Sequence, residues 1–271
     1  MNAKFRLVFC CAALFTLSIG NLKADLIGYT SLSDGSFGTV DLNTGAFSSL
    51  GNTDGVAFPG LGALNGTLYG TLYETFTGNL YRINPSNGTL TTVGDGATDY
   101  ECFGSTTSGL YALGYGGGAY GTLYSINPAN GAATSIGPTG LTVGAGPTAG
   151  DWFGLSTGSS TLYFSNLGNL YTINTSTGAA TEVGSIGTQV AAMVWEGGVL
   201  YGAAGTQIDT LNTTTGAATA GPNLSGTSGQ SIFGLAPDPL PSSPTAPEPG
   251  TTALFAVGAA ALGLVRRGRA R

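Results

Sequence analysis

The chain has 271 residues, of which only 8% are charged, none is histidine and 47 are glycine. The lack of histidine excludes a Ser-His-Asp triad, a Cys-His pair and any imidazole metal site, so we expect no metal and no cofactor. Between positions 25 and 246, Arg82 is the one basic residue against thirteen acidic ones, a net charge of −12. A surface of that charge repels nucleic acid phosphates and anionic lipids, so neither is an expected partner of this region.

The first 24 residues have the pattern of a secretory signal peptide. Two basic residues open the segment, an apolar stretch runs from Leu7 to Ile19, and small residues follow at Gly20 and Ala24. We therefore predict a signal helix that is cleaved after one of these two small residues. A retained membrane anchor is the less favoured alternative, because the apolar stretch is shorter than a membrane span requires.

The middle of the chain is a repeat. Five segments share a strand of β-branched or aromatic residues, then Asn or Asp, and a closing Gly: Phe37–Gly45, Leu80–Gly88, Leu123–Gly131, Leu170–Gly178 and Ile208–Gly216. This order predicts a β-hairpin, because Asn and Asp cap their own turn and Gly takes the positive-φ position. The first segment also resembles a calcium loop through Asp41 and Asn43, but the other four have Asn in place of Asp41. Turn chemistry explains all five segments.

Two further strands precede the hairpins. One carries a Leu-Tyr pair, at Leu68-Tyr69, Leu110-Tyr111, Leu162-Tyr163 and Leu200-Tyr201. The other is apolar and rich in small residues, at 58–64, 103–104, 153–155 and 191–194. Four strands in about 43 residues correspond to one blade of a β-propeller, with the small-residue strand innermost.

The number of strands predicts a closed ring. The N-terminal repeat offers only three strands, Leu26–Tyr29, Phe37–Asp41 and Ala46–Leu50, whereas Ser231–Ala236 after the last repeat has the pattern of an innermost strand. We therefore predict an all-β fold, a five-bladed β-propeller over residues 25–236 closed by its C-terminal strand, which hides the sheet edges. An open β-solenoid is the alternative, and it explains the period but not the extra strand.

The C-terminal segment has three parts. Six prolines predict an extended linker over residues 237–249, a charge-free apolar stretch follows from Thr251 to Val265, and four arginines come last, at Arg266, Arg267, Arg269 and Arg271. As a helix the apolar stretch would be about 22 Å long, short for a hydrocarbon core of about 30 Å. Flanking arginines favour the cytoplasmic side, so residues 250–271 are predicted to form a single transmembrane helix with a cytoplasmic basic cluster.

These three parts, with Pro247-Glu248-Pro249 at the end of the linker, resemble the PEP-CTERM sorting signal of exported bacterial proteins. The resemblance covers about residues 244–271 and departs at Ala246, where the family often has valine. It implies that an exosortase-type processing enzyme recognises Pro247, Glu248 and Pro249 and that the helix is a transient inner-membrane anchor. The protein would then reach the cell envelope or extracellular matrix of an exopolysaccharide-producing bacterium. The alternative is a simple tail anchor after a proline linker.

The repeat region itself indicates no reaction. We expect a binding or structural module, with exopolysaccharide or another surface component as its partner, and assign no catalytic residue. A passive protein that fills space in a matrix is one form of this reading. The alternative is a carboxylate-dependent glycan hydrolase or lyase, because glycan hydrolysis can run on carboxylates alone.

The best candidate site is a set of acidic residues just before the innermost strands. Asp54, Asp99 and Asp151 precede three of these strands, in connections that lie on the face of a propeller that usually holds ligands. Tyr100 and Trp152 would form adjacent apolar walls, so the sequence predicts a site for a cation or a sugar. Glu196 is left out because it falls at the far end of its strand. The alternative is that these are ordinary solvated loop acids on an acidic surface.

Overall fold

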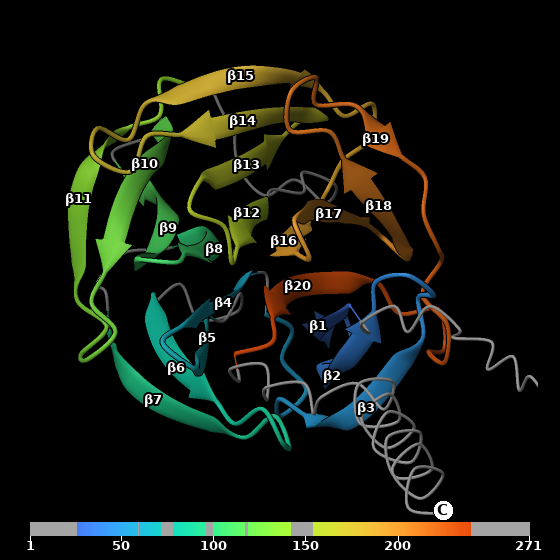
Figure 1. Ribbon diagram of the computed structural model, residues 1–271. Coiled ribbons are helices and arrows are strands. Elements are labelled where there is room, and N and C mark those ends of the chain that lie inside the picture. Colours follow the sequence, from blue (N-terminus) through green and yellow to red (C-terminus); the bar gives the residue numbers. More distant parts are fainter. Residues whose placement is uncertain are drawn as a thin grey trace, which may run out of the picture.

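The computed structural model describes residues 26–58, 60–71, 78–95, 100–116, 119–141 and 154–239. These residues form twenty β-strands and no helix (Figure 1). The all-β class predicted from the repeat is therefore confirmed. The predicted signal helix and the predicted helix over residues 250–271 lie outside the described residues. Within the described part of the chain, no helix is long and apolar enough to cross a membrane.

The strands form four-stranded antiparallel units in which each strand pairs with its neighbours. Unit 1 has the order β20-β1-β2-β3, with bounds Ile232–Pro237, Ile27–Leu32, Ser36–Asp41 and Phe47–Asn52. Unit 2 runs from β4 to β7, with bounds Gly60–Leu64, Thr67–Thr71, Asn79–Ile83 and Leu90–Asp95. Unit 3 runs from β8 to β11, with bounds Tyr100–Thr106, Gly109–Gly116, Ala119–Ile126 and Ala133–Pro138.

The last two units share one eight-stranded sheet. Unit 4 runs from β12 to β15, with bounds Gly154–Thr157, Leu162–Asn166, Asn169–Ile173 and Ala180–Ser185. Unit 5 runs from β16 to β19, with bounds Ala192–Glu196, Val199–Ala204, Gln207–Leu211 and Ala218–Thr219. A short parallel pairing of β12 with β16 joins the two units. Figure 1 shows the units around a common centre, with β4, β8, β12, β16 and β20 nearest to it.

The Leu-Tyr strands bury side chains on both faces, because each unit packs between two others. In β5, Leu68 belongs to the core shared with unit 1, and Tyr69 to the core shared with unit 3. Both side chains are at least 95% buried. This is the two-sided burial expected of a sheet covered on both faces, and it explains why bulky residues stand next to each other in these strands.

The turn chemistry predicted for the repeat is confirmed. The Asp41 carboxylate accepts a hydrogen bond from the Asn43 N–H at 2.8 Å, two residues on. The same bond recurs from Asn84, Asn127, Asn174 and Asn212 at 2.8–2.9 Å. The side-chain oxygen of this position therefore caps its own turn in all five repeats, as short polar side chains do.

A glycine near the end of the outer strand fixes how successive units approach. A side chain at Gly94 in β7 would collide with the carbonyl oxygen of Asn130, in the turn of unit 3. The same contact recurs in three further pairs: Gly51 with Asn87, Gly137 with Thr177 and Gly184 with Thr215. Only glycine permits backbone to meet backbone this closely. We call these four contacts the regular junctions.

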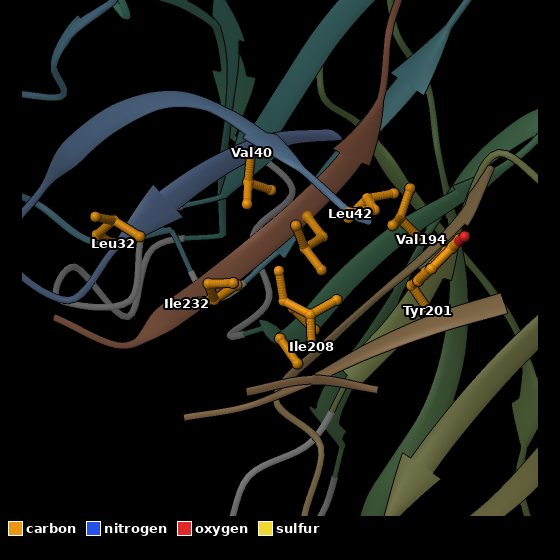
Figure 2. Close-up of a cluster of buried hydrophobic side chains, with 10 residues drawn as sticks. Leu32, Val40, Leu42, Val194, Tyr201, Ile208 and Ile232 are labelled. Carbon is orange, nitrogen blue, oxygen red and sulfur yellow. The ribbon is translucent and has the colours of Figure 1, made fainter. Parts of the chain in front are cut away.

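Units 5 and 1 meet in a different way, which we call the terminal junction. β19 has two residues, and the chain then continues alongside unit 1, where the Ser225 N–H donates to the Gly45 carbonyl at 2.8 Å. The Phe47 N–H donates in turn to the Ser225 carbonyl at 3.0 Å. Figure 2 shows the buried side chains of this junction, drawn from β20, unit 1 and unit 5: Leu32, Val40, Leu42, Val194, Tyr201, Ile208 and Ile232.

Candidate functional site

The antiparallel units give the molecule two faces. We call the open face the one that carries the β1–β2 turn at 33–35 and the β3–β4 connection at 53–58; the Thr53 N–H donates to the Gly35 carbonyl at 2.9 Å. We call the opposite one the exit face, because the described chain begins there at Leu26 and ends there at Pro239. A Cβ at Gly66, in the β4–β5 turn, would lie 3.4 Å from the Pro239 carbonyl oxygen.

Asp54 lies on the open face, in the β3–β4 connection. It is exposed and adopts a positive φ of 57°, next to Gly55, whose N–H donates to the Asn52 side chain at 2.6 Å. The Thr53 hydroxyl, which is fully buried, donates to the carbonyl of Gly35 at 2.9 Å. The backbone of this connection is therefore held firmly while the carboxylate projects outward.

Of the other predicted site residues, Tyr100 alone lies among the described residues. Tyr100 is the first residue of β8 and is 92% buried, with its ring edge-on to Tyr124 at a centroid distance of 6.3 Å. That packing leaves little of the ring for a ligand. Asp99, Asp151 and Trp152 lie outside the described residues, so the separation of the acidic residues stays untested.

The centre of the molecule is filled by small hydroxyl side chains. Ser31, Ser105 and Ser156 are fully buried, and each accepts a backbone N–H at 2.9–3.1 Å. The Thr157 hydroxyl in unit 4 donates across to the Leu235 carbonyl in unit 1 at 3.4 Å. Two of these hydrogen bonds join innermost strands of different units, Ser105 in β8 with Ala63 in β4 and Thr157 in β12 with Leu235 in β20, so small polar side chains contribute to the packing of the ring.

A second group of acids, which the sequence did not single out, lies on the exit face. Glu196 ends β16 and Asp238 follows β20, so both stand where an innermost strand reaches this face. Burial raises the pKa of Glu196, a hydrogen bond from the Gly197 backbone opposes this, and Asp238 raises it further. Burial raises the pKa of Tyr29, and so does Asp238. Burial is the largest cause of the raised pKa of Tyr201, and the charges of Glu196 and Asp41 raise this pKa further.

Sequence reasoning passed over this group because its members are far apart in the chain and share no repeat position. The prediction that Glu196 points away from the Asp54 connection is consistent with its place on the exit face. One signal was available: both acids stand at the C-terminal end of an innermost strand. Among the described residues, no group of three or more acidic or sulfur side chains could hold a metal ion.

Comparison with known proteins bears on both parts of the chain. Residues 245–269 match the family model described as the PEP-CTERM protein-sorting motif, which confirms the resemblance of the C-terminal segment. The chain is also similar to a chain in the crystal structure of a nidogen/laminin complex, with a TM-score of 0.52 and 9% identity. That match covers 79% of this chain and 98% of the other, and at such identity it shows the fold alone. No curated protein matches the chain.

The fold and the motif together define a class. The chain combines a β-propeller-like repeat region with a C-terminal PEP-CTERM sorting motif. The motif implies export and processing by an exosortase.

Proposed function

We propose that the five units are the blades of a closed propeller and that the protein displays this propeller at the cell envelope or in the extracellular matrix. Each unit has four strands, and β20 pairs with β1, with Tyr29 opposite Ala236 and Thr30 opposite Leu235. A strand from the end of the repeat region thus completes the unit at its beginning. Such closure leaves no exposed inner edge, which suits a protein that must persist outside the cell.

Sorting is the part of the function with the most direct support. The matched motif over residues 245–269 begins six residues after the last described residue, Pro239. We propose that Pro247, Glu248 and Pro249 are recognised by an exosortase, that residues 250–271 anchor the chain in the inner membrane until then, and that residues 1–24 direct export. The folded domain would span residues 25–236, with 237–249 as its linker.

Replacement of Pro247, Glu248 and Pro249 by alanine tests this. We expect a longer species that stays in the membrane fraction, while the unaltered protein is processed and leaves it. The matched control replaces Ser242 and Ser243, which lie in the same linker but outside the matched residues 245–269. Equal mass and equal location of all three proteins would show that the C-terminal segment is only a tail anchor.

For the displayed domain we propose a binding or structural role without catalysis. Asp54, Asp99 and Asp151, with Trp152, remain the candidate ligand site, and a cation or a sugar of an exopolysaccharide is the ligand class that suits them. The buried ring of Tyr100 would support this site from the core and offer a ligand little surface. Calorimetric titration of the domain with calcium chloride, and separately with neutral oligosaccharides, tests this. A D99N/D151N variant should lose whichever signal appears. Equal binding by the variant would place the binding site elsewhere on the domain, and no binding of either probe would leave the structural role.

A further inference from the structure

The described chain enters and leaves the domain at one place. The Leu26 carbonyl accepts the Leu42 N–H at 2.8 Å, and Gly28 pairs with Pro237, so both ends of the domain lie at the same edge of unit 1. Since β20 is an innermost strand, its end reaches the exit face near the centre of the molecule rather than at the rim (Figure 1).

Turns from three other units surround these two ends. A Cβ at Gly197 in unit 5 would lie 2.6 Å from Leu26 Cδ2, and one at Gly158 in unit 4 would lie 2.9 Å from Pro237 Cγ. In unit 2, Gly66 approaches the Pro239 carbonyl. The entering and leaving segments therefore cover the middle of the exit face. The open face has no chain end over it within the described residues.

We infer that, while the protein is anchored, the exit face lies toward the membrane and the open face points away, so that partners reach the ring through the open face. This rests on the proposed sorting, because it needs the C-terminal segment to act as a membrane tether. It goes beyond that proposal by assigning which face of the domain is turned toward the membrane.

The length of the tether supports a fixed orientation. Ten residues, 240–249, separate Pro239 from the proposed anchor, and a fully extended chain of that length spans at most about 36 Å. A compact domain of this size has a radius of gyration of about 17 Å, and hence a diameter near 45 Å. Such a tether, attached at the middle of one face, is too short to let the domain turn over.

The charge of the exit face limits its adhesion to the membrane. Glu196 and Asp238 stand on this face, and Arg82, the one base within residues 26–239, donates a hydrogen bond to the Pro128 carbonyl in the turn of unit 3. Anionic lipid headgroups repel such a surface. The exit face is therefore held close to the membrane by the tether without adhering to it.

Cysteine accessibility tests the orientation. In a background with Cys10, Cys11 and Cys102 replaced by alanine, Thr188→Cys reports on the open face and Ser176→Cys on the exit face. Both positions are exposed and both belong to the unit 4 repeat. In intact spheroplasts of a strain without active exosortase, we expect a 5-kDa polyethylene glycol maleimide to modify Thr188→Cys at least several-fold faster than Ser176→Cys. In the released domain the two rates should agree within about twofold.

Two further results complete the test. Insertion of twenty flexible Gly and Ser residues after Pro239 should remove the difference in the anchored protein, because the domain can then turn over. Equal labelling of the two positions in membrane-retained protein with the natural linker would overturn the orientation. Recovery of the unprocessed protein in the soluble fraction would instead overturn the proposed anchoring, and the orientation with it.

Discussion

The regular junctions and the terminal junction solve one packing problem by different means. In the regular junctions, a glycine of the outer strand meets a turn carbonyl of the next unit, and this contact recurs four times. The turn glycines Gly131, Gly178 and Gly216 meet the carbonyls of such outer-strand glycines in return. In the terminal junction, the turn glycine Gly45 of unit 1 instead meets the carbonyl of Asn223, which lies after β19. A repeat can encode contacts between successive units. It cannot encode the contact between its last unit and its first.

This difference explains which features could be predicted from the sequence. The turn residues and the Leu-Tyr strands recur, so hydrogen bonding and two-sided burial follow from each repeat by itself. The pairing of β20 with β1 could also be predicted, because unit 1 lacked an innermost strand and residues 231–236 had the pattern of one. The hydrogen bonds of Ser225 with Gly45 and Phe47 could not, because Ser225 lies after the last repeat and no repeat position indicates its place.

The acidic residues of the two faces differ in the same way. Asp54 could be predicted because it precedes an innermost strand, a place that the repeat defines. Glu196 and Asp238 influence each other only because units 5 and 1 meet, and that proximity is a property of the terminal junction. Tyr100 shows that residue type alone does not identify a binding residue. An aromatic residue beside a predicted site is more often part of the core, and this one packs against Tyr124.

Removal of β20 should have the largest effect. A domain of residues 25–230 loses Ile232, Leu235 and Ala236, all at least 99% buried, together with the pairing to β1. Burial of a large aliphatic side chain is worth about 1.5–3 kcal/mol, so the loss approaches the whole stability of a domain, about 5–15 kcal/mol. We expect no cooperative thermal transition by circular dichroism, whereas residues 25–239 should show one. A similar melting temperature for both would mean that the units form an open array.

A substitution at a regular junction should come next. Gly94→Ala forces a methyl group against the carbonyl oxygen of Asn130, and overpacking of this kind costs about 1–3 kcal/mol. For a domain of this size that lowers the melting temperature by roughly 3–10 °C. Gly140→Ala is the control: its φ is +76° but nothing lies within 4 Å, so only backbone strain of about 1 kcal/mol is expected. Equal losses in the two variants would show that the junctions tolerate a side chain.

A buried hydroxyl between units 4 and 5 should have a smaller effect. Ser165 donates to the Val190 carbonyl at 2.7 Å and accepts the Gly154 N–H at 3.0 Å. Ser165→Ala leaves both backbone groups without this partner, which costs about 1–3 kcal/mol, and we expect the lower half of that range because alanine fits the site. Chemical denaturation with urea measures the loss. Ser185→Ala, at an exposed position, is the control and should change stability by less than about 0.5 kcal/mol.

The smallest expected effect is a change in folding stability with pH, caused by the charge of Glu196 at the terminal junction. Burial and Asp238 raise the pKa of Glu196 in the folded protein above its ordinary value of 4.5. The folded state therefore binds this proton more tightly than the unfolded state does, and stability falls as pH rises from about 4.5 through the raised pKa. Because Glu196 is only partly buried, screening by solvent limits the change to less than about 1 kcal/mol, or a few degrees in melting temperature.

Glu196→Gln should remove this dependence while keeping the shape of the side chain. Between pH 4 and pH 7 the melting temperature of the unaltered domain is expected to fall more steeply than that of the variant, and the two curves should differ most at pH 7, where the variant is the more stable. Asp54→Asn is the control, because Asp54 is exposed on the open face and far from Asp238. Parallel curves for the unaltered domain and Glu196→Gln would show that the carboxylates do not oppose each other across the terminal junction, and that this junction differs from the regular ones in its backbone contacts alone.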